Sequence, residues 1–234
     1  MSGTVVAIDG PAASGKSSTA RSVAEALGFQ HLDSGALYRG ITLVALDLAR
    51  ERGAAGANPL DVVDPETILR GAEDRGLMLQ PDGHGFTAYY AGEPVDAAIR
   101  SAEVTARVSA VSAVAVIREW INARLRAMVR AGMDVVVDGR DIGTVVFPDA
   151  DLKIFLTATP QARATRRLAQ QGSSTDPVGI AQESERLAAR DRADSTRAVA
   201  PLSRAADAIE LDTTELDFAE QVARIVALAR ARGY

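Results

Sequence analysis

The chain has 234 residues, of which 47% are hydrophobic, enough for one globular domain with a full core. It contains no cysteine, which excludes disulfides, thiolate zinc sites and thiol catalysis. A formal net charge of −5 argues against general binding to nucleic acid, and no apolar run is long enough to span a bilayer. Because the first expected strand begins at Thr4, we expect no signal peptide and a cytoplasmic location.

Apolar runs and helical stripes alternate along most of the chain, which predicts strands separated by helices. The expected strands are 4–8, 29–32, 133–138, 152–156 and 208–211. The expected helices are 18–27, 36–52, one or two within 101–131 with a break at Ser112, one that opens at 159–160, one that ends near Thr196, and 216–232, with a flexible loop at 172–179. This order implies a parallel sheet covered on both faces.

The stretch from 58 to 95 interrupts the alternation. A helix is expected after Asp64, which is a suitable N-cap, with Pro65 in the first helical position. Three short strand-like pieces follow between 77 and 95, separated by turn-rich segments. We therefore expect an inserted subdomain at 64–100 that contains a small antiparallel β unit.

Residues 10–17 match the pattern G-x-x-x-x-G-K-[ST], the loop that wraps nucleotide phosphates. The loop follows a strand-like run and precedes a helix-like run, so that backbone N–H groups and the helix dipole both favour a phosphate. Lys16 is expected to reach the β- and γ-phosphates of ATP, and the Ser17 hydroxyl to ligate Mg²⁺ together with ATP phosphates and waters. The predicted ATP-binding residues are Gly10, Pro11, Ala12, Ala13, Ser14, Gly15, Lys16, Ser17 and Ser18.

The choice of basic residues supports this interpretation. The 26 basic residues include only two lysines, Lys16 and Lys153, so an arginine-rich chain uses lysine where a compact point charge is needed. A guanine-binding N-K-x-D motif is impossible, because neither Asn58 nor Asn122 precedes a lysine. This counts against a GTPase, and a motor or recombinase would normally be larger.

Two polar motifs follow expected strands, LDSGALYR at 32–39 and DGRDIGT at 138–144. Ligands of open α/β sheets bind at the carboxyl ends of strands, although Asp, Ser and Gly are also ordinary turn residues.

Two arginine clusters lie on the expected helices near the C-terminus. One contains Arg163, Arg166 and Arg167, and the other places Arg190, Asp194 and Arg197 on a single face. The spacing alone fits a solvated, salt-bridged helix equally well.

The order of GPAASGKSS, LDSGALYR, GEPVDAAIR, DGRDIGTVVFPDA and RDRADSTRAVAPL resembles the bacterial cytidylate kinases, which are ATP-dependent kinases of CMP and dCMP. The resemblance covers essentially the whole chain. It implies a single P-loop NTPase-type α/β domain over 1–234, with a five-stranded parallel sheet of order 2-3-1-4-5 flanked by helices. It also implies that the insert at 64–100 is a monophosphate-binding subdomain and that 158–185 forms a helical lid.

The same resemblance implies roles for individual residues. Those that bind CMP would hold its phosphate (Arg39, Arg140, Arg197), read the cytosine (Ser34, Arg118, Asp141), contact the sugar (Arg190, Asp194) or contribute from the insert (Arg100). The expected catalytic residues are Lys16, Arg140, Arg166 and Arg167, with Arg166 or Arg167 reaching the transferring phosphoryl when the lid closes and excludes water.

This chemistry agrees with the composition. A phosphate acceptor is already an anion, so catalysis is positioning plus cationic stabilisation and needs no general base. An ionised Asp141 accepts from the cytosine N4 amino group and repels the uracil carbonyl, which predicts preference for CMP and dCMP over UMP. His31 and His84 are expected to be uninvolved. The expected partners are ATP, CMP and dCMP with Mg²⁺, without nucleic acid or membrane, and the chain is expected to be a monomer.

Two other classes of function compete with this one. A small-molecule hydroxyl kinase of the shikimate or gluconate type would need a carboxylate near the acceptor hydroxyl, and Asp33 stands where one is needed. A nucleotide-dependent regulatory protein would hydrolyse ATP slowly without an acceptor. The insert and the DGRD segment argue against the first alternative, and the wealth of phosphate-binding residues argues against the second.

Overall fold

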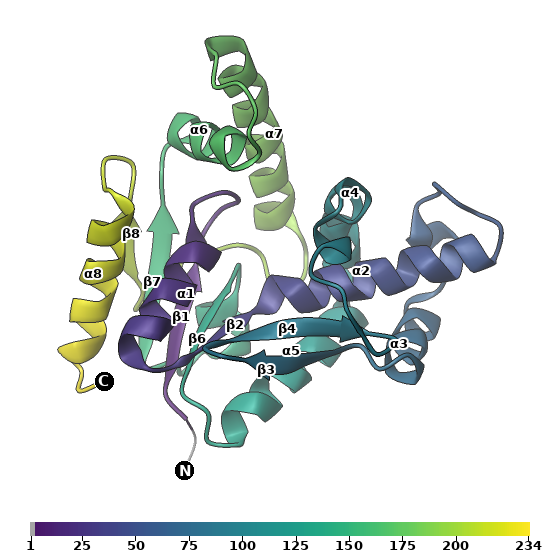
Figure 1. Cartoon of the computed structure of the whole chain (residues 1–234), viewed down its shortest axis with the longest axis horizontal. Coiled ribbons are helices and arrows are strands. Elements are labelled where there is room, and N and C mark those ends of the chain that lie inside the picture. Colours follow the sequence, from purple (N-terminus) through teal and green to yellow (C-terminus); the bar gives the residue numbers. More distant parts are fainter. Residues whose placement is uncertain (1–2) are drawn as a thin grey trace. The chain divides into compact units, whose positions relative to one another are not determined.

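The computed structural model describes residues 3–234 (Figure 1). The chain divides into two compact units. Unit 1 comprises the segment that ends at Leu32 together with Val129–Tyr234, and unit 2 comprises Asp33–Met128. None of the helices in the described residues is long and apolar enough to cross a membrane.

The main sheet has five strands in the order β2-β6-β1-β7-β8. They are β1 (Val5–Asp9), β2 (Gln30–Asp33), β6 (Val135–Gly139), β7 (Leu152–Thr157) and β8 (Ile209–Asp212). Strand β1 is buried along its whole length and pairs in parallel with both β6 and β7. Because β3 to β5 belong to the insert, this is the predicted order 2-3-1-4-5, which is confirmed.

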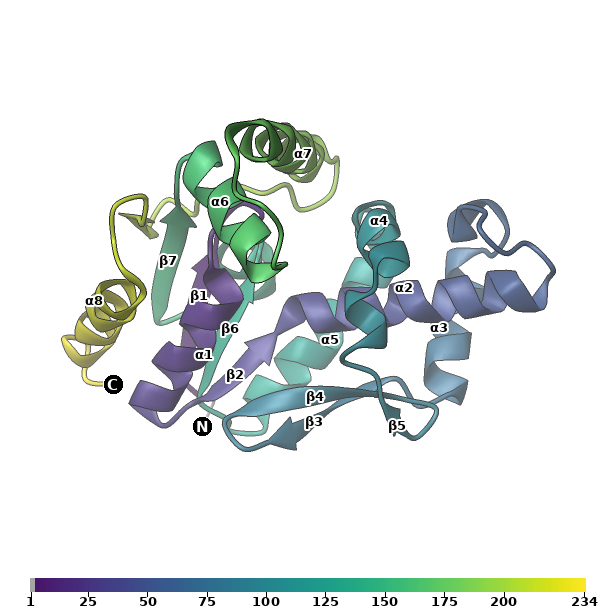
Figure 2. The ribbon, with the colours of Figure 1, turned by 45° about the horizontal axis from the view of Figure 1, so that its top comes forward.

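Unit 1 also contains α1 (Lys16–Leu27), α6 (Pro160–Gln170), α7 (Pro177–Thr196), α8 (Phe218–Arg230) and a π-helical turn, η3 (Ile142–Val146). Helices α1 and α8 pack together against the sheet, and α6 and α7 pack against each other (Figure 2). The main core of this unit joins apolar residues of α1 and α8 to those of the inner strands. Parallel strands buried in this way present their carboxyl ends, and hence their polar loops, at one edge of the sheet.

The structure corrects one expected boundary. The loop expected at 172–179 is shorter, because α7 already begins at Pro177. Asp176 caps this helix by accepting from the N–H of Gly179 at 2.8 Å, so Gly179 lies in the first turn and does not end a loop. The cap satisfies one of the N–H groups that a helix start leaves open.

Unit 2 contains α2 (Ser34–Glu51), α3 (Pro65–Asp74), α4 (Ala102–Val111) and most of α5 (Ala115–Arg130), with short 3-10 turns η1 (Pro59–Asp61) and η2 (Ala98–Arg100). The expected break near Ser112 separates α4 from α5. The antiparallel unit is confirmed as β3 (Met78–Asp82), β4 (Gly85–Tyr90) and β5 (Glu93–Pro94). As expected, Asp64 caps α3, where it accepts from the N–H of Thr67 at 2.8 Å.

A small core attaches the antiparallel sheet to α2. Ala36 of α2, Ala88 of β4 and Ile99 of η2 are all buried in it. Helix α2 approaches closely at Gly40, where a Cβ would lie 2.7 Å from the Cδ1 of Leu77. The glycine therefore lets Leu77 pack against the helix backbone at the start of the insert's strands.

Candidate active site

The predicted phosphate loop connects β1 to α1 in unit 1 and depends on its glycines. Gly10 has φ 152° and Gly15 has φ 87°, values that residues with a Cβ rarely adopt. A Cβ on Gly10 would lie only 2.1 Å from the carbonyl oxygen of Leu156 on the neighbouring strand β7. The first glycine is therefore required by the close approach of two strands as well as by the turn.

Lys16 is buried beneath this loop. Its Nζ donates to the carbonyl oxygen of Pro11 at 2.6 Å and to the Oγ of Ser14 at 3.2 Å. Burial lowers the pKa of Lys16, and the positive charges of Arg140 and Arg190 lower that pKa further. The carboxylates of Asp138 and Asp9 act in the opposite direction on the pKa of Lys16 but do not cancel the fall. A bound polyanion would stabilise the cations at the phosphate loop.

Ser17, the predicted Mg²⁺ ligand, donates from its Oγ to Asp138 Oδ2 at 2.6 Å. The other oxygen of Asp138 lies 2.8 Å from His31 Nε2. Burial alone would raise the pKa of Asp138, but the hydrogen bond and charge of His31, the Ser17 hydroxyl and Lys16 outweigh it and lower that pKa. His31 was expected to be uninvolved, yet it is hydrogen-bonded to the Asp138 carboxylate, which in turn accepts from the Ser17 hydroxyl.

These residues fit Mg²⁺. The ion usually keeps several waters and takes one or two protein oxygens together with substrate phosphates. The Ser17 hydroxyl and the ionised Asp138 are oxygen groups of this kind at the start of α1. No cluster of three or more His, Asp or Glu that would form an all-protein metal cage occurs within residues 3–234.

The loop after β6 brings together most of the acceptor-binding residues that were predicted in unit 1. Arg140 Nε donates to Asp194 Oδ2 at 3.0 Å. Arg197 NH2 lies 3.4 Å from Asp141 Oδ1, and the side chains of both residues are buried. Helix α7 and the loop after β6, which are far apart in sequence, thus meet through two ion pairs.

Three residues that sequence reasoning missed hold these loops in shape. Asp9 accepts from the backbone N–H groups of Ile142 and Gly143 at 2.8 and 2.7 Å. Burial raises the pKa of Asp9 to about 6, with the two backbone hydrogen bonds opposing the rise.

The other two residues that were missed are Arg163 and Asp191. Asp191 Oδ1 accepts from the N–H of Ala12 at 2.8 Å, and Arg163 NH1 donates to the Ala12 carbonyl at 2.8 Å and to Asp191 Oδ2 at 2.6 Å. Arg163 is only 5% exposed, so it is a buried anchor of the phosphate loop. No sequence signal distinguished it from Arg166 and Arg167 on the same helix.

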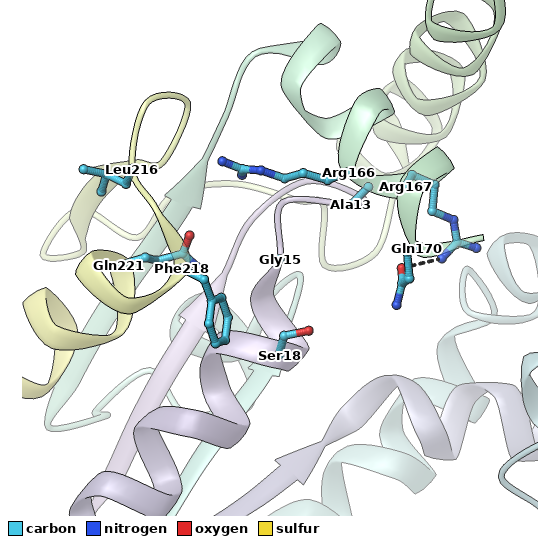
Figure 3. Close-up of a pocket in the computed structure, with 9 residues that line it drawn as sticks. All are labelled: Ala13, Gly15, Ser18, Arg166, Arg167, Gln170, Leu216, Phe218 and Gln221. Atoms are coloured by element: carbon cyan, nitrogen blue, oxygen red, sulfur yellow. Dashed lines mark hydrogen bonds between the residues drawn. The ribbon is translucent and has the colours of Figure 1, made fainter. Parts of the chain in front are cut away.

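A cavity of about 350 Å³ adjoins the phosphate loop (Figure 3). Its lining residues come from the loop, α1, α6 and the start of α8, and they are Ala13, Gly15, Ser18, Arg166, Arg167, Gln170, Leu216, Phe218 and Gln221. Figure 3 shows Arg166 reaching from α6 toward the loop that carries Leu216, while Arg167 points to the other side beside Gln170. Arg166 NH1 donates to Thr213 Oγ1 at 3.0 Å. The apolar residues of the cavity near α8 were not predicted from the sequence, since they carry no motif.

The remaining predicted acceptor residues lie in unit 2, at the N-terminal end of α2. Arg39 NH1 donates to Thr105 Oγ1 at 2.9 Å and to the Ile99 carbonyl at 3.2 Å. Arg118, 2% exposed, donates to the Ser112 carbonyl and stacks over the Tyr38 ring, 5.1 Å from its centroid.

Ser34 and Arg100 complete the set in this unit. Ser34 is buried as the first residue of α2, directly after Asp33. Asp33 caps the helix through the N–H of Ala36 at 3.2 Å and lies 3.5 Å from Arg100 NH2. The carboxylate that a hydroxyl kinase would require is therefore engaged in capping.

The similarity to known proteins extends over the whole chain. The sequence pattern of the cytidylate kinase family matches residues 6–231. The cytidylate kinase of Streptomyces griseus is 44% identical over 232 residues, which cover 99% of this chain and 94% of that protein. That of Geobacillus kaustophilus is 41% identical over 227 residues, covering 97% and 96%. A bifunctional pantoate ligase/cytidylate kinase of Synechococcus is 44% identical over 97% of this chain and 45% of the longer protein. The chain belongs to the cytidylate kinase family.

Proposed function

We propose that the protein transfers the γ-phosphoryl group of ATP to CMP or dCMP, which yields ADP and CDP or dCDP. The observation that carries this proposal is the gathering of Arg140 and Arg190 close to Lys16 at the phosphate loop. Two polyanions must approach each other in such a reaction, and only convergent cations offset their repulsion. Membership of the cytidylate kinase family supports the identity of the acceptor.

The reaction needs no group to remove a proton. An oxygen of the CMP phosphate forms a bond to the γ-phosphorus while the bond from that phosphorus to the β–γ bridging oxygen breaks, and ADP leaves with the electron pair. The protein's part is to align the two phosphates and to stabilise charge on the transferring group. Arginine suits this task because it stays charged at every physiological pH.

The donor half uses the phosphate loop. The loop's N–H groups and Lys16 bind the β- and γ-phosphates, and Ser17 with Asp138 holds Mg²⁺. When bound, Mg²⁺ neutralises charge on the phosphates and orients them. The cavity beside Ala13 and Gly15 is large enough for the nucleoside part of ATP.

The acceptor half uses the residues that the resemblance to the cytidylate kinases implies. In this proposal Arg39, Arg140 and Arg197 bind the CMP phosphate, and Arg190 and Asp194 contact the sugar. Ser34, Arg118 and Asp141 read the cytosine, and Arg100 assists from the insert at 64–100. The ion pair of Arg197 with Asp141 and the hydrogen bond that Arg140 donates to Asp194 support these roles, because they orient the groups concerned.

The segment 158–185 acts as a lid in this proposal, and Arg166 or Arg167 reaches the transferring phosphoryl when it closes. Small-angle scattering with and without a bisubstrate analogue tests the lid. We expect the radius of gyration to fall on binding, and an unchanged radius would contradict closure. We further expect a cytoplasmic monomer that uses Mg²⁺ with ATP.

A coupled assay of ADP release tests the function itself. The acceptors are CMP, dCMP, UMP, AMP, shikimate and gluconate, each at equal concentration with Mg²⁺ and ATP. We expect rapid release with CMP and dCMP and slower release with UMP. Release with an alcohol acceptor would indicate a hydroxyl kinase, and equal release without any acceptor would indicate a slow ATPase. Either result would overturn the proposal.

A further inference from the structure

Asp9 is a buried carboxylate to which the proposed mechanism assigns no role. It is the last residue of β1 and is 5% exposed. Its two oxygens accept the N–H groups of Ile142 at 2.8 Å and Gly143 at 2.7 Å. These are the first two residues of η3, the turn that follows Asp141. Asp9 therefore caps a turn that begins 133 residues further along the chain.

The position of Asp141 makes this cap unusual. Asp141 stands at the N-cap of η3 but forms no cap hydrogen bond with its own side chain. Aspartate is a favoured N-cap because its carboxylate ordinarily accepts the N–H two or three residues later. Here the N–H two residues later, that of Gly143, is bonded to Asp9, and Asp141 Oδ1 lies 3.4 Å from Arg197.

We propose that Asp9 is a positioning residue for base selectivity: by capping η3 in place of Asp141, it keeps the Asp141 carboxylate directed toward the acceptor base. The inference rests on the proposed function, in which Asp141 reads the cytosine amino group. Without Asp9, the N–H of Gly143 loses its acceptor, and the adjacent Asp141 is the nearest carboxylate in sequence that satisfies it. Local capping would then withdraw Asp141 from the base.

Close packing around Gly143 supports the role of the hydrogen bond between its N–H and Asp9. A Cβ at this position would lie 3.4 Å from Asp9 Oδ2 and 3.1 Å from the Cδ of Lys153. The carboxylate and the lysine stem thus both border the space that a side chain at Gly143 would occupy. The Asp141 carbonyl in addition accepts from the N–H groups of Val145 and Val146 at 2.9 and 3.1 Å, which fixes the backbone on its other side.

The test is the ratio of kcat/KM for CMP to that for UMP in Asp9→Asn. Asparagine keeps the shape and carries no buried charge, but its NH₂ group cannot accept from a backbone N–H. Since burial already raises the pKa of Asp9 to about 6, the neutral side chain is expected to fold. We expect the ratio to fall about tenfold or more, as for loss of one hydrogen bond to a charged group, with KM for ATP unchanged.

A double variant separates positioning from general damage. If Asp9 acts through Asp141, Asp9→Asn adds no further loss of the CMP-to-UMP ratio in an Asp141→Ala background. Asp151→Asn is the matched control, because Asp151 also accepts a backbone N–H of β1, that of Val5 at 2.8 Å, but at the other end of the strand. It should leave the ratio unchanged.

Each failure has its own signature. Equal losses for CMP and UMP in Asp9→Asn, with a selective loss in Asp141→Ala, would overturn the role of Asp9 alone. A wild-type protein without any preference for CMP would overturn the proposed function. Should Asp9→Asn not fold, Asp9→Ser removes both carboxylate oxygens from the N–H groups of Ile142 and Gly143 and should lower the ratio as well; an unchanged ratio there would overturn the inference.

Discussion

Two loops follow the neighbouring strands β1 and β6, and different elements of the fold hold each of them in its conformation. The phosphate loop turns through glycines of positive φ and is held by Asp191 and Arg163, which lie on α7 and α6. The loop after β6 continues into η3 and is held by Asp9 of the sheet itself. The backbone of the phosphate loop is therefore held by a helical hairpin and the backbone of the second loop by the sheet, although side chains of the second loop also pair with Asp194 and Arg197. Under the proposed function, binding of ATP would respond to changes in α6 and α7, whereas the backbone beside Asp141 would be fixed by the sheet.

The largest effect is expected inside the phosphate loop. Lys16→Ala should lower kcat by about 10³-fold or more, because it removes the charge at the β- and γ-phosphates. Steady-state kinetics with CMP measures the change. Lys153→Met is the control, since it removes the other lysine's bond to Asp207 but keeps its stem. Loss of kcat in the control, or retained turnover in Lys16→Ala, would contradict the role of Lys16.

Replacing one glycine of each loop with alanine compares how much stability each backbone loses when a Cβ is added. Gly10→Ala should destabilise the protein by about 3–5 kcal/mol, because the residue has φ 152° and its Cβ would lie 2.1 Å from a carbonyl oxygen. Gly143→Ala should cost about 1 kcal/mol, since the nearest atom is a flexible lysine methylene at 3.1 Å. Urea unfolding measures the free energy of unfolding of both variants, and equal losses would contradict the expected difference between the two loops.

The stability of the acceptor-side loop should depend on pH through Asp9. Burial raises the pKa of Asp9 from 3.8 to about 6, so the folded state binds a proton more tightly than the unfolded state. The free energy of unfolding of the wild type, relative to Asp9→Asn, should therefore rise as the pH falls from 8 through 6 toward 4, by about 3 kcal/mol at most. Urea unfolding of both proteins at several pH values measures this, and a constant difference would contradict it.

The smallest effect is expected at the anchor of the donor side. Asp191→Asn weakens the bonds to Ala12 and Arg163 and should raise KM for ATP about tenfold, while KM for CMP changes little. Initial rates with each substrate varied in turn give the KM for ATP and the KM for CMP separately. A parallel rise in both KM values would mean that Asp191 supports the whole unit rather than the phosphate loop.

The sequence predicted those features that short-range chemistry determines. The phosphate loop follows from the spacing of Gly10, Gly15 and Lys16, and helix starts follow from pairs such as Asp64-Pro65. The strand order and the small antiparallel sheet were also predicted correctly. The boundary near Gly179 was wrong because a glycine in a first helical turn looks like a loop residue until its cap, Asp176, is identified.

Contacts between distant segments were beyond sequence reasoning. The hydrogen bonds between His31 and Asp138, between Ile142 and Asp9 and between Ala12 and Asp191 join residues separated by 107, 133 and 179 positions. No motif links the two residues of any pair. Only the folded chain brings these carboxylates to the loops that they shape.

One contact at the rim of the cavity bears on the hydrolysis of ATP in the absence of an acceptor. Arg166 donates hydrogen bonds to both the hydroxyl and the carbonyl oxygen of Thr213. The same guanidinium is proposed to touch the transferring group, and it cannot serve both partners at once. Leaving Thr213 costs about 1.5–3 kcal/mol for each hydrogen bond, because the guanidinium is charged, and a negative charge on the transferring group would offset that cost. Under the proposed function, the bonds to Thr213 would hold Arg166 away from the transferring phosphoryl in the resting state and so slow the loss of ATP to water.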